Sequence, residues 1–179
     1  MALVLTIGGV DRTSVLKAGS LRIEQLADTL ISIARLTLVD EDSDISISCK
    51  DAITVVDGAT TYFSGYVGNV TRDTQLGTYR LLKLECQDHN ILLNAVVDSE
   101  EAFSGEADAD IIDSLFDDYL PAIDSETYVD TVQDPMTITF ENKTLRECLN
   151  EICTRSGALY YIDFDSNLHY FSDEADGVA

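Results

Sequence analysis

Residues 60–88 read TTYFSGYVGNVTRDTQLGTYRLLKLECQD, and this stretch decides the fold. Two runs rich in aromatic and β-branched residues flank the short glycine-containing turn TQLG at residues 74–77, which is the pattern of a β-hairpin. Because side chains alternate along a strand, Tyr66 and Val70 are expected on one face of the first run and Val67 on the other. Each run is longer than an average strand, which has about five or six residues.

Long paired strands of this kind build barrels and sheets that hold large assemblies together, and they carry no chemistry of their own. The hairpin is therefore interpreted as an assembly element. Five of its residues are candidates for the barrel wall and its assembly contacts: Tyr62, Phe63, Tyr66, Val67 and Leu84.

The chain before and around this hairpin also reads as β-structure up to about residue 97. Short strands are expected at residues 3–7, 19–24, 34–39, 45–48 and 53–56, the last of them followed by the turn dipeptide Asp57-Gly58. Several short strands at this spacing suggest a closed barrel or a sandwich. We therefore expect an antiparallel β-domain, a barrel or a sandwich, over residues 1–97.

The pattern changes to helical spacing in residues 98–179. Residues 107–120 place apolar side chains on one stripe of a helix, and Pro121 follows where that helix should end. Residues 136–140 form a short strand, and Thr144 with Glu147 forms a capping box for a second helix that ends at Gly157. A hairpin over residues 158–171 completes a small α+β domain, so the predicted fold class is α+β with two domains.

The net charge is extreme, because 33 Asp and Glu oppose 11 Lys and Arg, giving −22. Phosphate backbones are bound by cations, so direct nucleic-acid binding is not expected. No Lys or Arg lies between Lys83 and Lys143. The simple interpretation is a solvated, repulsive surface. A sharper one is adaptation to high salt, where charge screening removes self-repulsion.

No residue pattern indicates catalysis or a cofactor. His89 and His169 lack a nucleophile context, the four cysteines show no C-x-x-C spacing, and no phosphate-binding or dinucleotide motif occurs. No stretch approaches the length of a membrane span. One metal pattern has to be weighed: Asp163, Asp165, Asn167 and Glu174 match calcium-loop positions, but Leu168 stands where that loop requires glycine. We therefore expect no enzyme, no cofactor and no metal, with an acidic calcium-dependent binding module as an alternative.

The series of segments resembles the tail-tip, or baseplate-hub, proteins of tailed phages. The segments that carry the resemblance are 11–14 (DRTS), 19–24 (GSLRIE), 62–67 (YFSGYV), 84–88 (LECQD), 104–105, 110–112, 144–149 (TLRECL), 156–158, 160–163 and 168–171. The resemblance implies a tail tube-like barrel with an inserted α+β domain, located at the tail tip of the virion and assembled in the host cytoplasm. It implies a scaffold with a channel for the genome and without catalysis.

The partners that the resemblance implies are further copies of the chain, usually three around the tail axis, the tail tube or distal tail protein, the tape-measure protein, and tip, spike or fibre proteins. Hub chains typically carry two barrels, whereas this sequence ends before a second one. A shortened chain, a second chain that supplies the rest, and a different symmetry all remain open. A distal tail protein, which forms a hexameric ring, is the alternative within the same class. A tip hydrolase and a DNA-mimic inhibitor fit the sequence less well, because the first lacks a nucleophile and the second needs no long hairpin.

Overall fold

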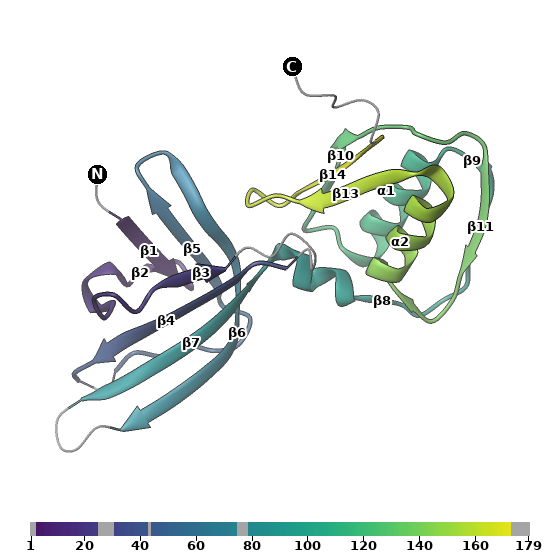
Figure 1. The fold of residues 1–179 in the computed structure, drawn as a ribbon. Coiled ribbons are helices and arrows are strands. Elements are labelled where there is room, and N and C mark those ends of the chain that lie inside the picture. The colour runs from purple at the N-terminus through teal and green to yellow at the C-terminus, as the bar shows by residue number, and fades with distance from the viewer. Residues whose placement is uncertain (1–2, 25–30, 43, 75–78, 173–179) are drawn as a thin grey trace. The chain divides into compact units, whose positions relative to one another are not determined.

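A computed structural model describes residues 3–24, 31–42, 44–74 and 79–172 (Figure 1). The chain divides into two compact units, Met1–His89 and Asn90–Ala179, which are described separately below. Three residues of the predicted turn, 75–77, lie outside the described residues, and so does Glu174 of the calcium pattern. The α+β class is confirmed: a large antiparallel sheet accompanies two helices and three small sheets.

Unit 1 consists of one seven-stranded sheet with the order β2-β1-β5-β6-β7-β4-β3. Its strands are β1 (Leu3–Ile7), β2 (Val10–Asp11), β3 (Arg22–Glu24), β4 (Ile33–Asp40), β5 (Ala52–Asp57), β6 (Thr60–Thr74) and β7 (Arg80–Asp88). All neighbouring pairs are antiparallel. Alternate residues of these strands are buried, as in Leu36 and Leu38 of β4, so one face of the sheet forms the core.

The 15-residue strand β6 is the first strand of the predicted hairpin, and the sheet bends along it (Figure 1). Its first part pairs with β5 and its second part with β7, and the two pairings overlap only near Gly65 and Tyr66 (Figure 1). The register with β7 shifts between Val67 and Asn69. Because a β-bulge adds one residue to a strand, Val67 and Val70 both lie opposite buried residues of β7. The prediction that Val67 and Val70 point to opposite faces is therefore wrong.

No strand ladder closes this sheet within the described residues, where β2 and β3 are its two edges. The segment between them partly joins the halves. Arg12 N–H donates to the Leu5 carbonyl of β1, and Lys17 N–H donates to the Thr37 carbonyl of β4. Leu16 also forms an isolated bridge with Leu38. This segment contains the 3₁₀ turn η1 (Thr13–Val15).

Residues 45–48 alternate as predicted, with Ile45 and Ile47 buried, but they form no strand. The Ile47 carbonyl accepts a hydrogen bond from the Arg72 side chain, and Lys50 N–H donates to the Val67 carbonyl. The segment therefore runs beside β6 without a regular ladder. Apolar alternation alone cannot distinguish a buried extended segment from a paired strand.

In unit 2, two helices pack against a three-stranded sheet. Its elements are η2 (His89–Asn94, which begins at the end of unit 1), β8 (Val96–Val97), β9 (Glu101–Glu106), α1 (Asp108–Tyr119), β10 (Asp124–Val129), β11 (Met136–Phe140), β12 (Lys143–Thr144), α2 (Leu145–Ser156), β13 (Ala158–Ile162) and β14 (Asn167–Ser172). The predicted helices, the strand at 136–140 and the final hairpin are all confirmed. The structure adds β9, which pairs with β11, and β10, which pairs in parallel with β14.

Helix α2 begins and ends as its sequence predicts. The Thr144 hydroxyl accepts from the Glu147 amide while the Glu147 carboxylate accepts from the Thr144 amide, which completes the capping box. Gly157 adopts the left-handed conformation with φ 76°. None of the helices in the described residues is long and apolar enough to cross a membrane.

Candidate assembly site

The five candidate assembly residues divide into core and surface positions. Phe63, Val67 and Leu84 are buried in the core of unit 1. Tyr66 is half-buried, and its ring meets the edge of the His89 ring with centroids 5.5 Å apart. Tyr62 is 48 % exposed, at the extra residue of a bulge opposite β5. Tyr62 is therefore the member of the set best placed to contact another molecule.

Gly65 allows the close approach of β6 and β7 at the bend. A Cβ atom added at this position would lie 2.1 Å from the Gln87 carbonyl oxygen and 2.6 Å from Asp88 Cα. Only glycine fits, because both obstacles are backbone atoms. The glycine of the YFSGYV segment thus has a structural role that periodicity does not reveal.

A buried serine and histidine lie beside this bend. Ser64 Oγ and His89 Nε2 are 3.0 Å apart, which is the spacing of a nucleophile and its base. Both residues are only 7 % exposed, so a substrate has no access to the hydroxyl. We interpret the pair as a satisfied polar contact within the core.

The loop after β4 is organised by a buried carboxylate that the sequence analysis missed. Asp40 Oδ1 accepts from the amides of Asp44 and Ile45, and Oδ2 accepts from Nε and Nη2 of Arg80 at 3.0 and 2.6 Å. Burial by itself would raise the pKa of Asp40. The hydrogen bonds from Arg80 and the loop amides, together with the Arg80 charge, outweigh burial and hold this pKa below its usual value. Only the register of β4 with β7 brings Asp40 opposite Arg80.

A second buried carboxylate, Asp108, holds unit 2 together. Its two oxygens accept from the amides of Ala109, Val132 and Gln133 and from the Tyr170 hydroxyl, the last at 2.6 Å. The Tyr170 hydroxyl also lies 2.8 Å from Ser156 Oγ. Burial and the hydrogen bond to Asp108 raise the pKa of Tyr170, so the phenol stays protonated and can donate. Asp108 thus joins α1, the 130–135 loop and β14.

The calcium pattern forms a tight turn of the last hairpin. Asp163 Oδ1 accepts from the amides of Asp165 and Asn167, and Oδ2 lies 2.9 Å from His169 Nε2. Both carboxylate oxygens are thus already bonded within the hairpin. Within the described residues, no group of three or more His, Cys, Asp and Glu is placed to hold a metal. These contacts favour a structural turn over the calcium alternative.

The four cysteines are free thiols. Burial raises the pKa of Cys86 to about 12 and the pKa values of Cys148 and Cys153 to about 11, so these three are protonated at neutral pH. Cys49 is exposed. The sequence favours small buried apolar positions for all four cysteines; this holds for Cys86 and Cys148, which lie in the core, and is wrong for Cys49.

Solved structures of other proteins share this fold over nearly the whole chain. The 43 kDa tail protein of prophage MuSo2 from Shewanella oneidensis matches with a TM-score of 0.76 at 18 % identity, covering 95 % of this chain and 55 % of its own. A tail protein from Neisseria meningitidis MC58 matches with a TM-score of 0.69 at 17 % identity. The match covers 94 % of this chain and 50 % of the Neisseria protein. This chain has the fold of phage tail proteins. The resemblance predicted from the sequence is confirmed at the level of the fold.

A third match extends the likeness beyond phages. It is an Escherichia coli component of the type VI secretion system, described as structurally similar to the T4 bacteriophage tail proteins gp27 and gp5. Its TM-score is 0.65 at 11 % identity, covering 98 % of this chain and 50 % of its own. The chain thus spans about half the length of the solved structures it matches. No family model and no curated protein sequence matches the chain.

Proposed function

We propose that this chain is a structural protein of a phage tail tip, a hub subunit that assembles around the tail axis and has no catalytic role. The observation that carries the proposal is the fold match to a prophage tail protein and a second tail protein over 94–95 % of the chain. On this proposal the protein is located in the virion tail. It connects the tail tube or distal tail ring to tip, spike or fibre proteins, with the tape-measure protein as a further neighbour.

On this proposal, the two parts of the chain have different roles. Residues 1–97 would act as the tube-like barrel, with its two sides partly joined by the Arg12–Ser20 segment that is bonded to Leu5 and Thr37. Residues 98–179 would act as the inserted α+β domain. Within the barrel, Tyr62 would contact neighbouring subunits, while Phe63, Val67 and Leu84 would hold its strand in place and Tyr66 would support the bend.

The partition of charge suggests which part faces the genome. Residues 1–89 hold 12 carboxylates and eight basic side chains, whereas residues 90–179 hold 21 and three. We propose that the acidic residues between 98 and 134, or those of the barrel, line the channel, where they would repel DNA phosphates and prevent the passing genome from sticking.

The location is tested by gold-labelled antibody against the chain on intact tails of the phage or injection machine that encodes it, viewed by electron microscopy. Labelling at the distal end of the tail supports the proposal. Labelling along the whole tube or at the head end would overturn it. A density map of the same particles would show three copies per ring for a hub and six for a distal tail protein. The map would also show whether residues 98–134 face the channel or the outer wall.

A further inference from the structure

Strand β13 forms one edge of the three-stranded sheet of unit 2, and within the described residues it pairs only with β14 (Figure 1). The Asp163 amide donates to the Asn167 carbonyl at the turn, which sets the alternation of the ladder. In an antiparallel pair every second residue bonds across the ladder, and the residues between point their N–H and C=O groups the other way. The backbone groups of Tyr160 and Ile162 therefore point to the outer edge, where no described residue bonds to them.

This edge lacks the features that normally protect an edge strand, which are charges, proline, irregular pairing or short length. The opposite edge strand of the same sheet, β10, has an irregular register with β14 and begins with Asp124. On β11, the Thr137 carbonyl accepts from the Arg155 side chain. The edge strands β2 and β3 of unit 1 have only two and three residues. Strand β13 reads ALYYI and pairs without a register shift, so its edge is open to a further strand.

Apolar side chains lie beside the same edge. Leu159 and Tyr161 are 49 % and 42 % exposed, on the face of the sheet opposite the buried residues of β13. The Tyr161 ring stacks on the His169 ring, with centroids 4.4 Å apart and planes 5° apart. It also lies edge-to-face with Phe171, with centroids 6.1 Å apart. Because these contacts already restrict Tyr161, covering it costs little further side-chain entropy.

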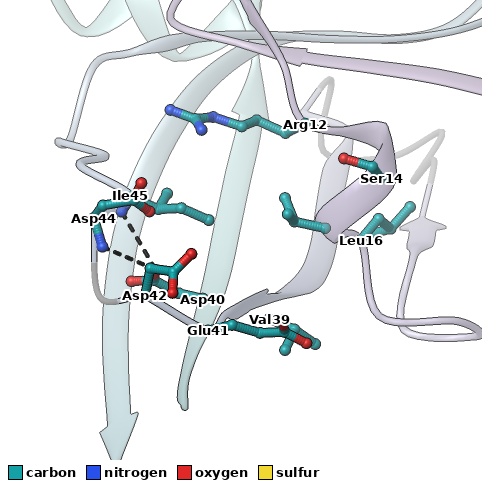
Figure 2. A pocket seen from close by; sticks show the side chains of 10 residues that line it. Arg12, Ser14, Leu16, Val39, Asp40, Glu41, Asp42, Asp44 and Ile45 are labelled. Atoms are coloured by element: carbon teal, nitrogen blue, oxygen red, sulfur yellow. Dashed lines mark hydrogen bonds between the residues drawn. The ribbon is translucent and has the colours of Figure 1, made fainter. Parts of the chain in front are cut away.

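The pocket of about 510 Å³ between η1 and the loop after β4 is less suited to a ligand (Figure 2). Its buried carboxylate, Asp40, accepts from the amides of Asp44 and Ile45, as the dashed lines in Figure 2 show. The same carboxylate also accepts from Arg80. A ligand in this pocket would find the buried group occupied, whereas a segment beside β13 would find unpaired donors and acceptors.

An extended polypeptide is the ligand class that satisfies both features of β13. Its backbone can pair with Tyr160 and Ile162, and its alternate side chains then lie beside Leu159 and Tyr161. A flat aromatic molecule would cover Tyr161 but leave the backbone groups unpaired. Nucleic acid is disfavoured by charge, because residues 90–179 hold 21 carboxylates and only three basic side chains.

The same charge indicates the kind of polypeptide. A second copy of the chain would bring its own acidic half to the contact, where like charges repel. A segment that carries Lys or Arg is attracted instead, and such complementarity also speeds and orients association.

We infer that the edge of β13 binds an extended segment of a different protein, which adds a fourth strand to the sheet. Apolar residues of that segment face Leu159 and Tyr161, and Lys or Arg residues flank them. The identification of that protein as a neighbour in the tail rests on the proposed function, but the binding itself does not.

The first test is amide hydrogen exchange of the full-length protein alone. The amides of Tyr160 and Ile162 should exchange faster than those of Leu159 and Tyr161, which bond to β14. Slow exchange at Tyr160 and Ile162 would show that another part of the chain or a second copy already covers the edge. That result would overturn the inference.

The second test is an NMR titration of the ¹⁵N-labelled full-length protein in low salt with acetyl-Lys-Thr-Val-Thr-Val-Thr-Lys-amide. We expect amide shifts concentrated in residues 158–162 and slower exchange of Tyr160 and Ile162. Two control peptides should bind roughly three- to tenfold more weakly. In the first, proline replaces the central threonine and removes a backbone donor. In the second, glutamate replaces both lysines and reverses the flanking charge.

A pair of protein variants tests the apolar contact. Leu159→Thr keeps a residue that favours strands but removes apolar surface beside the edge, so it should weaken binding roughly three- to tenfold. Val96→Thr is the matched control, because Val96 is 51 % exposed on β8, also in unit 2. It should leave affinity unchanged.

The inference is overturned if millimolar peptide causes no shifts, or if either control peptide binds as tightly as the first peptide. Equal affinities of Leu159→Thr and Val96→Thr would also overturn it. If Leu159→Thr fails to fold, the comparison of the three peptides on the wild-type protein decides. Failure of peptide binding leaves the antibody-labelling result unaffected, so the two proposals can fail separately.

Discussion

A few single residues determine where the backbone of this protein bends and where distant segments meet. Gly65 lies where two strands approach too closely for any side chain. Asp40 joins its own loop to the distant Arg80, and Asp108 accepts from several donors that are distant in sequence. Such residues determine which backbone segments can meet, so their replacement has effects beyond the loss of one contact.

Replacing Gly65 with Ala should destabilise the protein by about 1–3 kcal/mol or more, the usual cost of overpacking a tight site. The added methyl would collide with the Gln87 and Asp88 backbone, which can move only by opening the bend. Urea denaturation measures the change. Gly68→Ala is the matched control, since its nearest neighbour would lie at 3.4 Å. Equal midpoints for the two variants would contradict the prediction.

Replacing Tyr170 with Phe should lower the free energy of unfolding by about 1–3 kcal/mol, because the buried Asp108 carboxylate loses a donor that no water can replace. Thermal unfolding followed by circular dichroism measures the loss. Tyr62→Phe removes a hydroxyl from an exposed ring and should change stability little. A Tyr170→Phe variant as stable as wild type would show that Asp108 does not depend on this bond.

Asp40 should make stability depend on acid pH. Its pKa is lower in the folded state than in the unfolded chain, so its stabilisation is complete above the ordinary aspartate value of about 3.9 and is lost as pH falls through the folded pKa. The difference in unfolding free energy between wild type and Asp40→Asn should therefore shrink as pH falls below about 4. Denaturant unfolding between neutral pH and pH 3 tests this. A difference that stays constant over that range would refute it.

Among the elements, helix α1 carries charge in its last turn that interacts unfavourably with the helix dipole. Asp117 and Asp118 lie in its last turn, with no basic residue there, whereas Asp110 lies favourably in the first turn. Helix α2 has the opposite arrangement, with Glu147 in its first turn and Arg155 in its last. The acidic last turn thus destabilises α1, and the packing of its buried face must offset this destabilisation.

Neutralising Asp117 or Asp118 with Asn should stabilise the protein by about 0.3–1 kcal/mol each in low salt, because a negative charge leaves the negative end of the helix. Asp110→Asn is the control of opposite sign and should destabilise by a similar amount. Chemical denaturation at low and molar salt measures both. If all three variants shift stability in the same direction, net charge and not the dipole is responsible.

At the scale of the whole molecule, the negative charge is concentrated in one half of the chain. Residues 90–179 carry 21 of the 33 carboxylates and only three basic side chains. Charges of one sign at this density repel one another and oppose a compact state unless salt screens them. The two units should therefore respond differently to ionic strength.

Raising NaCl from 0.1 to 1 M shortens the screening distance from about 10 Å to about 3 Å. Amide hydrogen exchange of the full chain should then slow severalfold more in the core of unit 2 than in that of unit 1. Leu115 and Leu149 report on unit 2, and Leu36 and Val55 report on unit 1. Equal protection at both salt concentrations would argue against adaptation to high salt.

Local signals in the sequence were enough to predict many elements. The capping box at Thr144, the Gly157 terminus, the helix at 107–120 and the alternation in residues 34–39 each act within a few residues, so they can be read directly from the chain. The sequence likewise shows directly that negative charge is concentrated in residues 90–179. The hairpin at residues 60–88 was visible because its pairing partners are adjacent in sequence.

The tertiary structure alone decided the features that depend on distant pairing. The bulge at Gly68 changed which face Val70 occupies, and the register of β4 with β7 placed Asp40 against Arg80. The burial of Asp108 depends on Tyr170, 62 residues away. Periodicity reports the local environment of a residue, whereas these contacts depend on how sheet register and chain crossings bring remote segments together.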